Sequence, residues 1–493
     1  MTKHVIIVGG GLAGLSAGAY ARASGFETTI VEHNLALGGV CTAWPRGAYT
    51  VDGCIHWLTG GPFLRLYEEL GIVPAVELRT LEHWATWRDA QDGTTVSITR
   101  DFDALARDLH ALGPDDASEI ARVLQMAGRF PEMTPPGIEQ PPELATVREQ
   151  LASLWEMRAS LGILAHFRKP IDVWAREHIH SEALRRFFVG LVPAEAPALL
   201  LGMIFGYLKR GYLSRPVGGT ARFRDALIGS YQRLGGKAIL HATVDEILVD
   251  DGRAQGVRLA DGTILTADAV ISTSSTPETV LRLLGGRFDD EPTRDRLARW
   301  KLFDPIVLAS FGVAAPYART PSLLTIDGIK PFDVGGRSVS SLSVRVCNDD
   351  PCFAPPGHTV IQAMLPTDYE WWVSRGTRYH EEKAAVAEAT LTALEPHFPQ
   401  LRSVVRMTDL ATPLTYWGRT RSWRGAYEGW MPNAESLFGH VKKTLSGLDG
   451  FYMAGQWVEP GGGVPMAVMS GRQAIQLICK DAARPFVAST RRS

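Results

Sequence analysis

Residues 3–18 read KHVIIVGGGLAGLSAG, and this stretch decides the fold. The apolar, largely β-branched run before the glycines is typical of a buried parallel strand. Gly9, Gly11 and Gly14 then satisfy the pattern G-x-G-x-x-G, and small residues at helical spacing follow them. A strand, a glycine turn and a helix in this order predict the first βαβ unit of a dinucleotide-binding domain.

Each glycine of this turn has its own physical task. Gly9 permits the tight turn, Gly11 lets the backbone approach a pyrophosphate, and Gly14 lets the helix pack against the strand. Leu12 and Ala13 stand at the start of the helix, where free N–H groups and the positive end of the helix dipole favour phosphate. The turn therefore predicts a site for the pyrophosphate of a dinucleotide.

An acidic residue and a second glycine pair extend this site. A strand over 28–31 ends at Glu32, 18 residues after Gly14, where a carboxylate can accept hydrogen bonds from a ribose. Gly38 and Gly39 follow, and a glycine pair at this place is typical of flavoproteins that bind FAD in an extended conformation. The predicted cofactor is therefore FAD.

The C-terminal glycines are predicted to lie at the flavin end of the cofactor. Residues 450–465 read GFYMAGQWVEPGGGVP, a short strand that ends at Gly455, followed by three glycines and the start of a helix. Gly462, Gly463 and Val464 would present a row of backbone N–H groups. Such donors would stabilise the negative charge that the pyrimidine part of a flavin gains on reduction.

Strand and turn signals in the middle of the chain predict the rest of the same domain. We expect a β-meander over 238–272, with Val244 on its first long strand near the adenine. The expected fold class is α/β, with a Rossmann-like FAD-binding domain, of the type with two dinucleotide-binding motifs, assembled from discontinuous segments. The predicted boundaries are 1–75, 214–290 and 425–485 for the FAD-binding domain, and 76–213 and 291–424 for a mixed α+β substrate domain.

Further motifs join these glycine-rich segments in one order along the chain. They are GGGLAGLSAG at 9–18, GG at 38–39, VDGCIHWLTGG at 51–61, PVGGT at 216–220, ADAVISTSSTPE at 267–278, TDLATPLT at 408–415 and AGQWVEPGGGVP at 454–465. In these motifs the chain resembles the phytoene desaturase superfamily of FAD-dependent oxidoreductases, which includes carotenoid isomerases and retinol saturases. The resemblance implies a two-part flavoprotein that acts on a lipophilic substrate, often a polyene. Cys54 departs from the family pattern, because relatives often have glycine at that place.

Side chains in and near the flavin-end motifs are the candidates for catalysis. His56 or Glu459 could move a proton while the flavin accepts a hydride. Trp57, Tyr416 and Trp457 are expected to line the substrate pocket. Simple packing is the alternative role for these side chains, since flavin dehydrogenation does not strictly require a catalytic side chain.

Neither a metal site nor a second nucleotide site is expected. His178 and His180 would point apart on a helix, no carboxylate stands at ligand spacing, and no cysteine spacing suits zinc. No second G-x-G-x-x-G pattern occurs, so no separate NAD(P)H domain is expected. Electrons are expected to leave a reduced flavin to oxygen, a quinone or another acceptor.

Three functions remain open on these observations. The main prediction is an FAD-dependent enzyme that desaturates or dehydrogenates a polyene, an isoprenoid or another lipophilic natural product. The alternatives are a saturase or isomerase that uses reduced FAD, and a non-catalytic FAD-binding protein. The row of glycines at the flavin end argues against the last, because a protein that only binds FAD has no use for stabilising a reduced flavin.

Composition narrows the cellular setting. The 493 residues carry 51 basic and 53 acidic side chains, and this near balance gives no general field for nucleic acid. Five scattered cysteines imply no disulfide framework, and no signal peptide is expected, so a cytoplasmic protein is predicted. The longest apolar stretch, 194–208, is too short to span a bilayer but could line a pocket or touch a membrane surface. The oligomeric state stays open.

Overall fold

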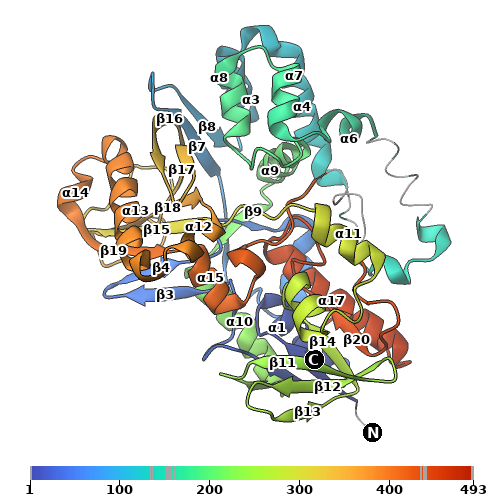
Figure 1. Ribbon diagram of the computed structural model, residues 1–493. Coiled ribbons are helices and arrows are strands. Elements are labelled where there is room, and N and C mark those ends of the chain that lie inside the picture. The colour runs from blue at the N-terminus through green and yellow to red at the C-terminus, as the bar shows by residue number, and fades with distance from the viewer. Residues whose placement is uncertain are drawn as a thin grey trace.

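The protein consists of two lobes and a helical cap, as the computed structural model in Figure 1 shows. The structure describes residues 3–489 except 134, 136, 151–154, 156–157, 159–160, 434–435 and 437–440. The lower lobe in that view carries the N-terminal strand and the C-terminal helix, and the helical cap stands at the top. The second lobe, at the left, is built on a large sheet.

A five-stranded parallel sheet forms the centre of the lower lobe, in the order β10-β2-β1-β14-β20. Its strands are β1 (His4–Val8), β2 (Glu27–Val31), β10 (Lys237–Ile239), β14 (Ala269–Ser272) and β20 (Phe451–Met453). Ile6 and Ile7 of β1 are fully buried, because the sheet is covered on both faces. Segments far apart in the chain therefore meet in one sheet, and the predicted α/β, Rossmann-like fold class is confirmed.

The expected β-meander over 238–272 is only partly present. The antiparallel sheet contains β11 (Val244–Asp250), β12 (Arg253–Leu259) and β13 (Ile264–Thr266). The flanking strands β10 and β14 instead join the parallel sheet beside β2 and β1. The prediction of one continuous meander was wrong because short apolar strands look alike in sequence whether their partner is the next strand or a distant one.

Three helices pack around the parallel sheet: α1 (Leu12–Ala23), α10 (Gly219–Arg233) and α17 (Gly463–Asp481). The helices α1 and α17 cross closely, since a Cβ on Gly471 would lie 2.5 Å from the carbonyl oxygen of Ala13. At this crossing the buried Ser16 hydroxyl donates to the carbonyl of Val468 at 2.8 Å. The contact sets the N-terminal ends of the two helices near each other.

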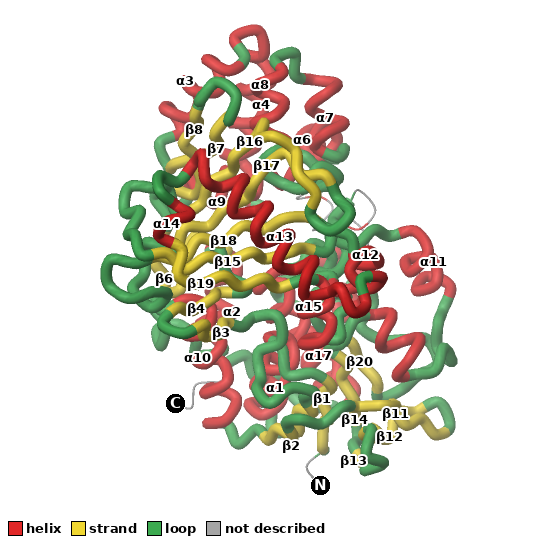
Figure 2. The backbone as a smooth tube through the Cα atoms, turned by 60° about the vertical axis from the view of Figure 1, so that its left-hand side comes forward, coloured by secondary structure: helices red, strands yellow, loops and turns green. Residues whose placement is uncertain are grey.

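The second lobe is built on a seven-stranded mixed sheet, in the order β19-β15-β18-β17-β16-β7-β8. Figure 2 shows α13 (Tyr379–Leu394) lying across one face of this sheet, where Val386 and Leu391 pack into its core. The strands are β7 (His83–Asp89), β8 (Thr95–Thr99), β15 (Ile306–Val313), β16 (Leu323–Asp333), β17 (Ser338–Val346), β18 (Thr359–Pro366) and β19 (Val405–Ala411).

The helical cap lies against the β7–β8 end of the large sheet (Figure 1). Its helices α4 and α9 approach closely, because Gly202 and Gly206 of α9 face Met126 and the carbonyl of Ala127 with no side chain between. The cap comprises α3 (Phe102–Leu112), α4 (Ala117–Arg129), α6 (Leu161–Phe167), α7 (Ile171–His178), α8 (Glu182–Val189) and α9 (Leu199–Lys209).

Short elements complete the structure. They are β3 (Ala43–Arg46), β4 (Tyr49–Asp52), β5 (Leu58–Thr59), α2 (Leu64–Glu69), β6 (Leu78–Thr80), β9 (Leu213–Pro216), α11 (Glu291–Arg299), α12 (Tyr369–Ser374), α14 (Leu401–Val404) and α15 (Pro413–Thr420). The β3–β4 hairpin packs against the large sheet, where the Tyr49 ring occupies the space in front of Gly312. Among the described helices, none is both long enough and apolar enough to cross a membrane.

Candidate active site

One cavity of about 1990 Å³ extends through both lobes and the cap. Its lining includes the glycine turn after β1, the C-terminal glycine loop, strands of the large sheet and α9. A single small-molecule site occupies roughly 300–1,000 Å³. The cavity therefore has room for a large cofactor and a second bulky molecule at once.

The glycine turn after β1 forms one wall of this cavity. A Cβ on Gly14 would lie 2.1 Å from the carbonyl oxygen of Gly9, so the close contact of helix and strand requires glycine. A Cβ on Gly11 would meet no protein atom nearer than the Cα of Gly39, 3.8 Å away. Gly11 thus faces open cavity, and Gly38 is fixed beside it because its N–H donates to the carbonyl of Gly10 at 2.8 Å.

Glu32 holds this turn in place from the end of β2. Its carboxylate accepts hydrogen bonds from the N–H of Gly10 at 2.7 Å and from the N–H of Asn34 at 2.8 Å. Glu32 and Val244 both line the cavity at this end, together with Leu12 and Ala13 at the start of α1. The predicted cofactor-binding residues of the N-terminal half thus lie around one space, except Gly14, which packs against the Gly9 carbonyl and does not line the cavity.

The C-terminal glycine loop lines the same cavity. Gly461, Gly462 and Gly463 have φ angles of +97°, +61° and +83°, a conformation that favours glycine at each of the three positions. Gly455 is fixed because its N–H donates to the Ser470 hydroxyl at 2.7 Å. Gly463 and Val464 begin α17, so the first N–H groups of this helix lie at the cavity wall.

His56 lines the cavity but is a weak base. Burial lowers its pKa to about 3, and the positive charges of Arg345 and Arg215 add to the effect. Arg215 also holds the segment, since its Nε donates to the carbonyl of His56 at 2.7 Å. The imidazole is therefore neutral throughout the physiological pH range. Its neighbour Trp57 lines the cavity and packs edge-on against Trp84.

Glu459 also lines the cavity, and it neutralises a buried lysine. Its carboxylate lies 2.6 Å from the Nζ of Lys443, whose side chain is fully buried. Because an unpaired ammonium is costly to bury, this ion pair is a structural role for Glu459. Acid–base chemistry at Glu459 would compete with it.

Glu428 is a cavity residue that the sequence analysis did not identify. Burial raises the pKa of its carboxyl to about 7. Its backbone packs on the C-terminal glycine loop, since a Cβ on Gly462 would lie 2.7 Å from the carbonyl oxygen of Glu428. A pKa near the working pH is the property that a general acid or base needs. The one sequence signal for Glu428 is its position next to Tyr427, in the segment that returns to the lower lobe.

A profile for the flavin-containing amine oxidoreductase family matches residues 12–479. The chain belongs to this family. It is an FAD-dependent oxidoreductase, and the prediction of FAD as the cofactor is confirmed. The match begins in the glycine turn and ends in α17, so the flavin-containing amine oxidoreductase fold takes in both lobes and the cap.

Individual relatives of this flavin-containing amine oxidoreductase agree with the resemblance found in the sequence. A 4,4'-diapolycopene oxygenase from Methylomonas sp. is 26% identical, covering 97% of this chain and 98% of the relative. A lycopene-forming phytoene desaturase from Paracoccus sp. is 24% identical, covering 98% of both proteins. The crystal structure of an oxidoreductase from Methanosarcina mazei has a TM-score of 0.62 at 18% identity, with 96% of this chain and 100% of that chain covered. The predicted superfamily is confirmed.

The residues present fit the FAD that family membership implies. The open space in front of Gly11 is one that any Cβ would begin to fill, and the N-termini of α1 and α17 both border the cavity. Backbone N–H groups at these two helix starts suit the pyrophosphate and a reduced flavin ring. Gly11, Leu12 and Ala13 would hold the phosphates, while Gly462 and Gly463 would face the ring.

The part of the cavity beyond the glycines is lined mainly by apolar side chains. Tyr416 lies there, while the Trp457 ring packs on Trp430 with the ring centroids 5.1 Å apart. The apolar lining comes from α9 and the large sheet: Leu199, Leu200, Met203, Ile204, Tyr207, Ile306, Leu308, Leu324, Val344 and Met364. The apolar stretch noted in the sequence, 194–208, thus lines a pocket.

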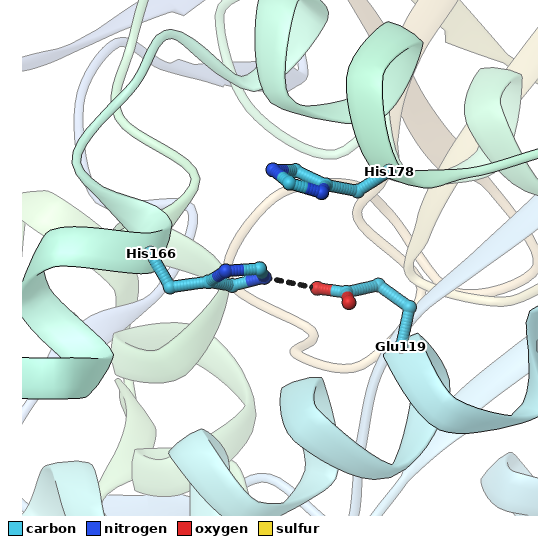
Figure 3. Close-up of side chains that lie close together, drawn as sticks. All are labelled: Glu119, His166 and His178. Carbon is cyan, nitrogen blue, oxygen red and sulfur yellow. Dashed lines mark hydrogen bonds and ion pairs between the residues drawn. The ribbon is translucent and has the colours of Figure 1, made fainter.

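The two histidines considered as a metal pair have different partners. His180 Nδ1 lies 2.8 Å from Asp116, whereas His178 lies beside His166, which contacts Glu119 of α4 (Figure 3). The possible ligand atoms of Glu119, His166 and His178 all lie within 4.8 Å of one another. The carboxylate of Glu119 is already engaged by His166 at 2.5 Å and by Arg122 at 3.0 Å. These contacts tie α4 to α6. The expectation that His178 and His180 share a helix was wrong, because α7 ends at His178.

Proposed function

We propose that this protein desaturates an extended apolar substrate, removing two hydrogens from a carbon–carbon single bond. The observation that carries the proposal is the single cavity that joins the glycine turns to the apolar lining of α9 and the large sheet. FAD, when bound, supplies a two-electron acceptor for a hydride. We further propose that oxygen or a quinone reoxidises it.

The apolar lining binds and positions the substrate. Most of the side chains that α9 and the large sheet present to this space are apolar, so transfer of a hydrocarbon from water into it is favourable. The relatives support the choice of substrate class, because their names refer to diapolycopene and phytoene. We propose a polyene or another long lipophilic molecule for this chain.

Glu428 is proposed to accept the proton that leaves the substrate. The sequence predicted His56 or Glu459 for this role. The pKa of His56 is about 3, and Glu459 is paired with Lys443, so Glu428 with its pKa near 7 suits the role better. His56 and Trp57 are then proposed to shape the wall near the reacting carbons.

Anaerobic mixing with a polyene tests the proposed function. Purified protein with oxidised FAD is mixed with phytoene in detergent micelles, and the flavin absorbance and the extracted product are followed. The expected result is bleaching of the flavin without added reductant, together with a product that has lost two hydrogens. Conversion only after the flavin has been reduced beforehand would instead establish a saturase or an isomerase.

A further inference from the structure

Two of the five cysteines lie opposite each other across the β3–β4 hairpin. The hairpin pairs Ala43 with Asp52, and beyond it the N–H of Gly53 donates to the carbonyl of Thr42 at 3.0 Å. Continuing this register by one residue puts Cys41 opposite Cys54. Residues directly opposite each other in an antiparallel pair have Cα separations of about 4.5–5.5 Å, within the range that a disulfide spans.

Contacts around the hairpin end hold the two thiols together. A Cβ on Gly53 would lie 2.5 Å from the Trp44 ring and 2.9 Å from the Thr42 carbonyl oxygen, so glycine allows the two segments to approach. A hydrogen bond from the Cys54 thiol raises the pKa of Cys41, and burial adds to the increase. The Cys54 thiol therefore lies close enough to Cys41 to shift the pKa of the Cys41 thiol.

Both thiols line the cofactor cavity. Cys41 is buried, while Cys54 is partly exposed and lies two residues before His56. The remaining cysteines, Cys347, Cys352 and Cys479, do not line this cavity. The fold therefore brings two thiols together in the wall of the cofactor cavity, although the five cysteines are scattered along the sequence.

We infer that Cys41 and Cys54 form a reversible disulfide, a two-electron redox site in the wall of the cofactor cavity. The oxidant is a low-molecular-weight disulfide, such as glutathione disulfide. The Cys54 thiolate attacks one glutathione sulfur and releases the first glutathione thiol. Cys41 then loses its proton and displaces the second glutathione. The S–S bond of glutathione disulfide breaks, the Cys41–Cys54 bond forms, and two glutathione thiols carry away the electrons and protons.

Peptide mass spectrometry of the FAD-loaded protein tests the inference. The protein is incubated without oxygen in glutathione disulfide, its free thiols are alkylated, and it is digested with trypsin. Cleavage after Arg46 separates the two cysteines into peptides 23–46 and 47–65, each with one cysteine. We expect a disulfide-linked pair of these peptides, loss of two of the five thiols, and recovery of both thiols on treatment with dithiothreitol.

Two cysteine variants test whether the disulfide joins Cys41 to Cys54 specifically. Cys54→Ser should leave Cys41 alkylated in full, whereas Cys352→Ser, which removes an exposed cysteine, should leave the linked peptides unchanged. The wild-type protein decides the question even if Cys54→Ser folds poorly. The inference is overturned if the folded protein keeps all five thiols, if Cys54 carries only glutathione, or if the linked peptides form only after unfolding.

Discussion

At the scale of single residues, Glu428, Glu459 and His56 all line the cavity, but their surroundings differ. Burial raises the pKa of Glu428 to about 7 and lowers that of His56 to about 3, because in both cases it disfavours the charged form. Glu459 instead has the ammonium of Lys443 at 2.6 Å. The same cavity therefore holds one carboxyl suited to proton transfer, one neutral imidazole and one structural ion pair.

The pH dependence of flavin reduction should follow Glu428. Because a general base works in its deprotonated form and burial puts this pKa at about 7, the rate of flavin reduction by substrate should rise with pH through about 7. Glu428→Gln should slow the reaction by about 10²-fold or more and remove this rise, while FAD stays bound. Anaerobic stopped-flow measurements between pH 5 and pH 9, roughly the span around that pKa, provide the check. An unchanged profile in Glu428→Gln would assign the proton to another group.

The Lys443–Glu459 pair should matter for stability. Glu459→Gln leaves a fully buried ammonium without its carboxylate, so the free energy of unfolding of the FAD-loaded protein should fall by about 3 kcal/mol. The double variant Lys443→Met/Glu459→Gln should recover most of that loss. Lys301–Glu195, an exposed pair with the same 2.6 Å separation, is the control, and Glu195→Gln should cost under about 1 kcal/mol. If urea denaturation showed equal losses of unfolding free energy for Glu459→Gln and Glu195→Gln, the structural role of Glu459 would be contradicted.

At the scale of elements, much of the fold could be predicted because its signals are local. The glycine turn, the helix α1 that follows it, β2 and the start of α17 were expected where the structure has them. The strand β16 was not expected, since Gly328 and Pro331 interrupt its sequence like a turn. The placement of β14 between β1 and β20 depends on partners far along the chain, which no local pattern records.

The same limit applies to the site. The glycines and Glu32 were recognisable because their spacing is fixed by the phosphate chemistry. The importance of Glu428 comes from its burial, and that of Glu459 from Lys443, both of which depend on how the lobes pack. The Cys41–Cys54 pair depends on a hairpin register. The sequence therefore predicts the cofactor, whereas the pKa and the partners of individual side chains depend on the tertiary structure.

Two glycines of the first turn should respond differently to the same substitution. Gly11 has an ordinary backbone conformation and faces open cavity, so Gly11→Val should fold but fill the space for the pyrophosphate and abolish FAD binding. Gly14→Val would press a side chain against the carbonyl of Gly9 and should destabilise the fold by at least about 3 kcal/mol. Far-UV circular dichroism and the visible spectrum of the purified proteins distinguish the outcomes. A yellow Gly11→Val protein would contradict the assignment of the phosphate site.

At the scale of the whole molecule, the two lobes line different parts of one cavity. The strands of the parallel sheet come from 4–31, 237–272 and 451–453, and this arrangement supports the proposed FAD-binding domain of residues 1–75, 214–290 and 425–485. The large sheet and the cap come from the proposed substrate domain, 76–213 and 291–424, and supply most of the apolar lining. Changes in the cap should therefore affect substrate turnover without affecting the cofactor.

A substitution at Met203 of α9 tests whether the cap affects substrate turnover without affecting FAD binding. The Met203 side chain lines the cavity in the cap, on the helix that packs against α4 rather than against the parallel sheet. Met203→Trp adds bulk to the apolar lining, and a steric cost of about 1–3 kcal/mol corresponds to a loss of about 5- to 150-fold in kcat/KM for a long polyene. The Kd for FAD should stay unchanged, because the glycine turns lie in the other lobe. Met203→Leu, which nearly conserves volume, should retain activity within a few-fold and serves as the control. If Met203→Trp weakened FAD binding as much as turnover, or left the long polyene unaffected, the substrate would have to bind elsewhere in the cavity.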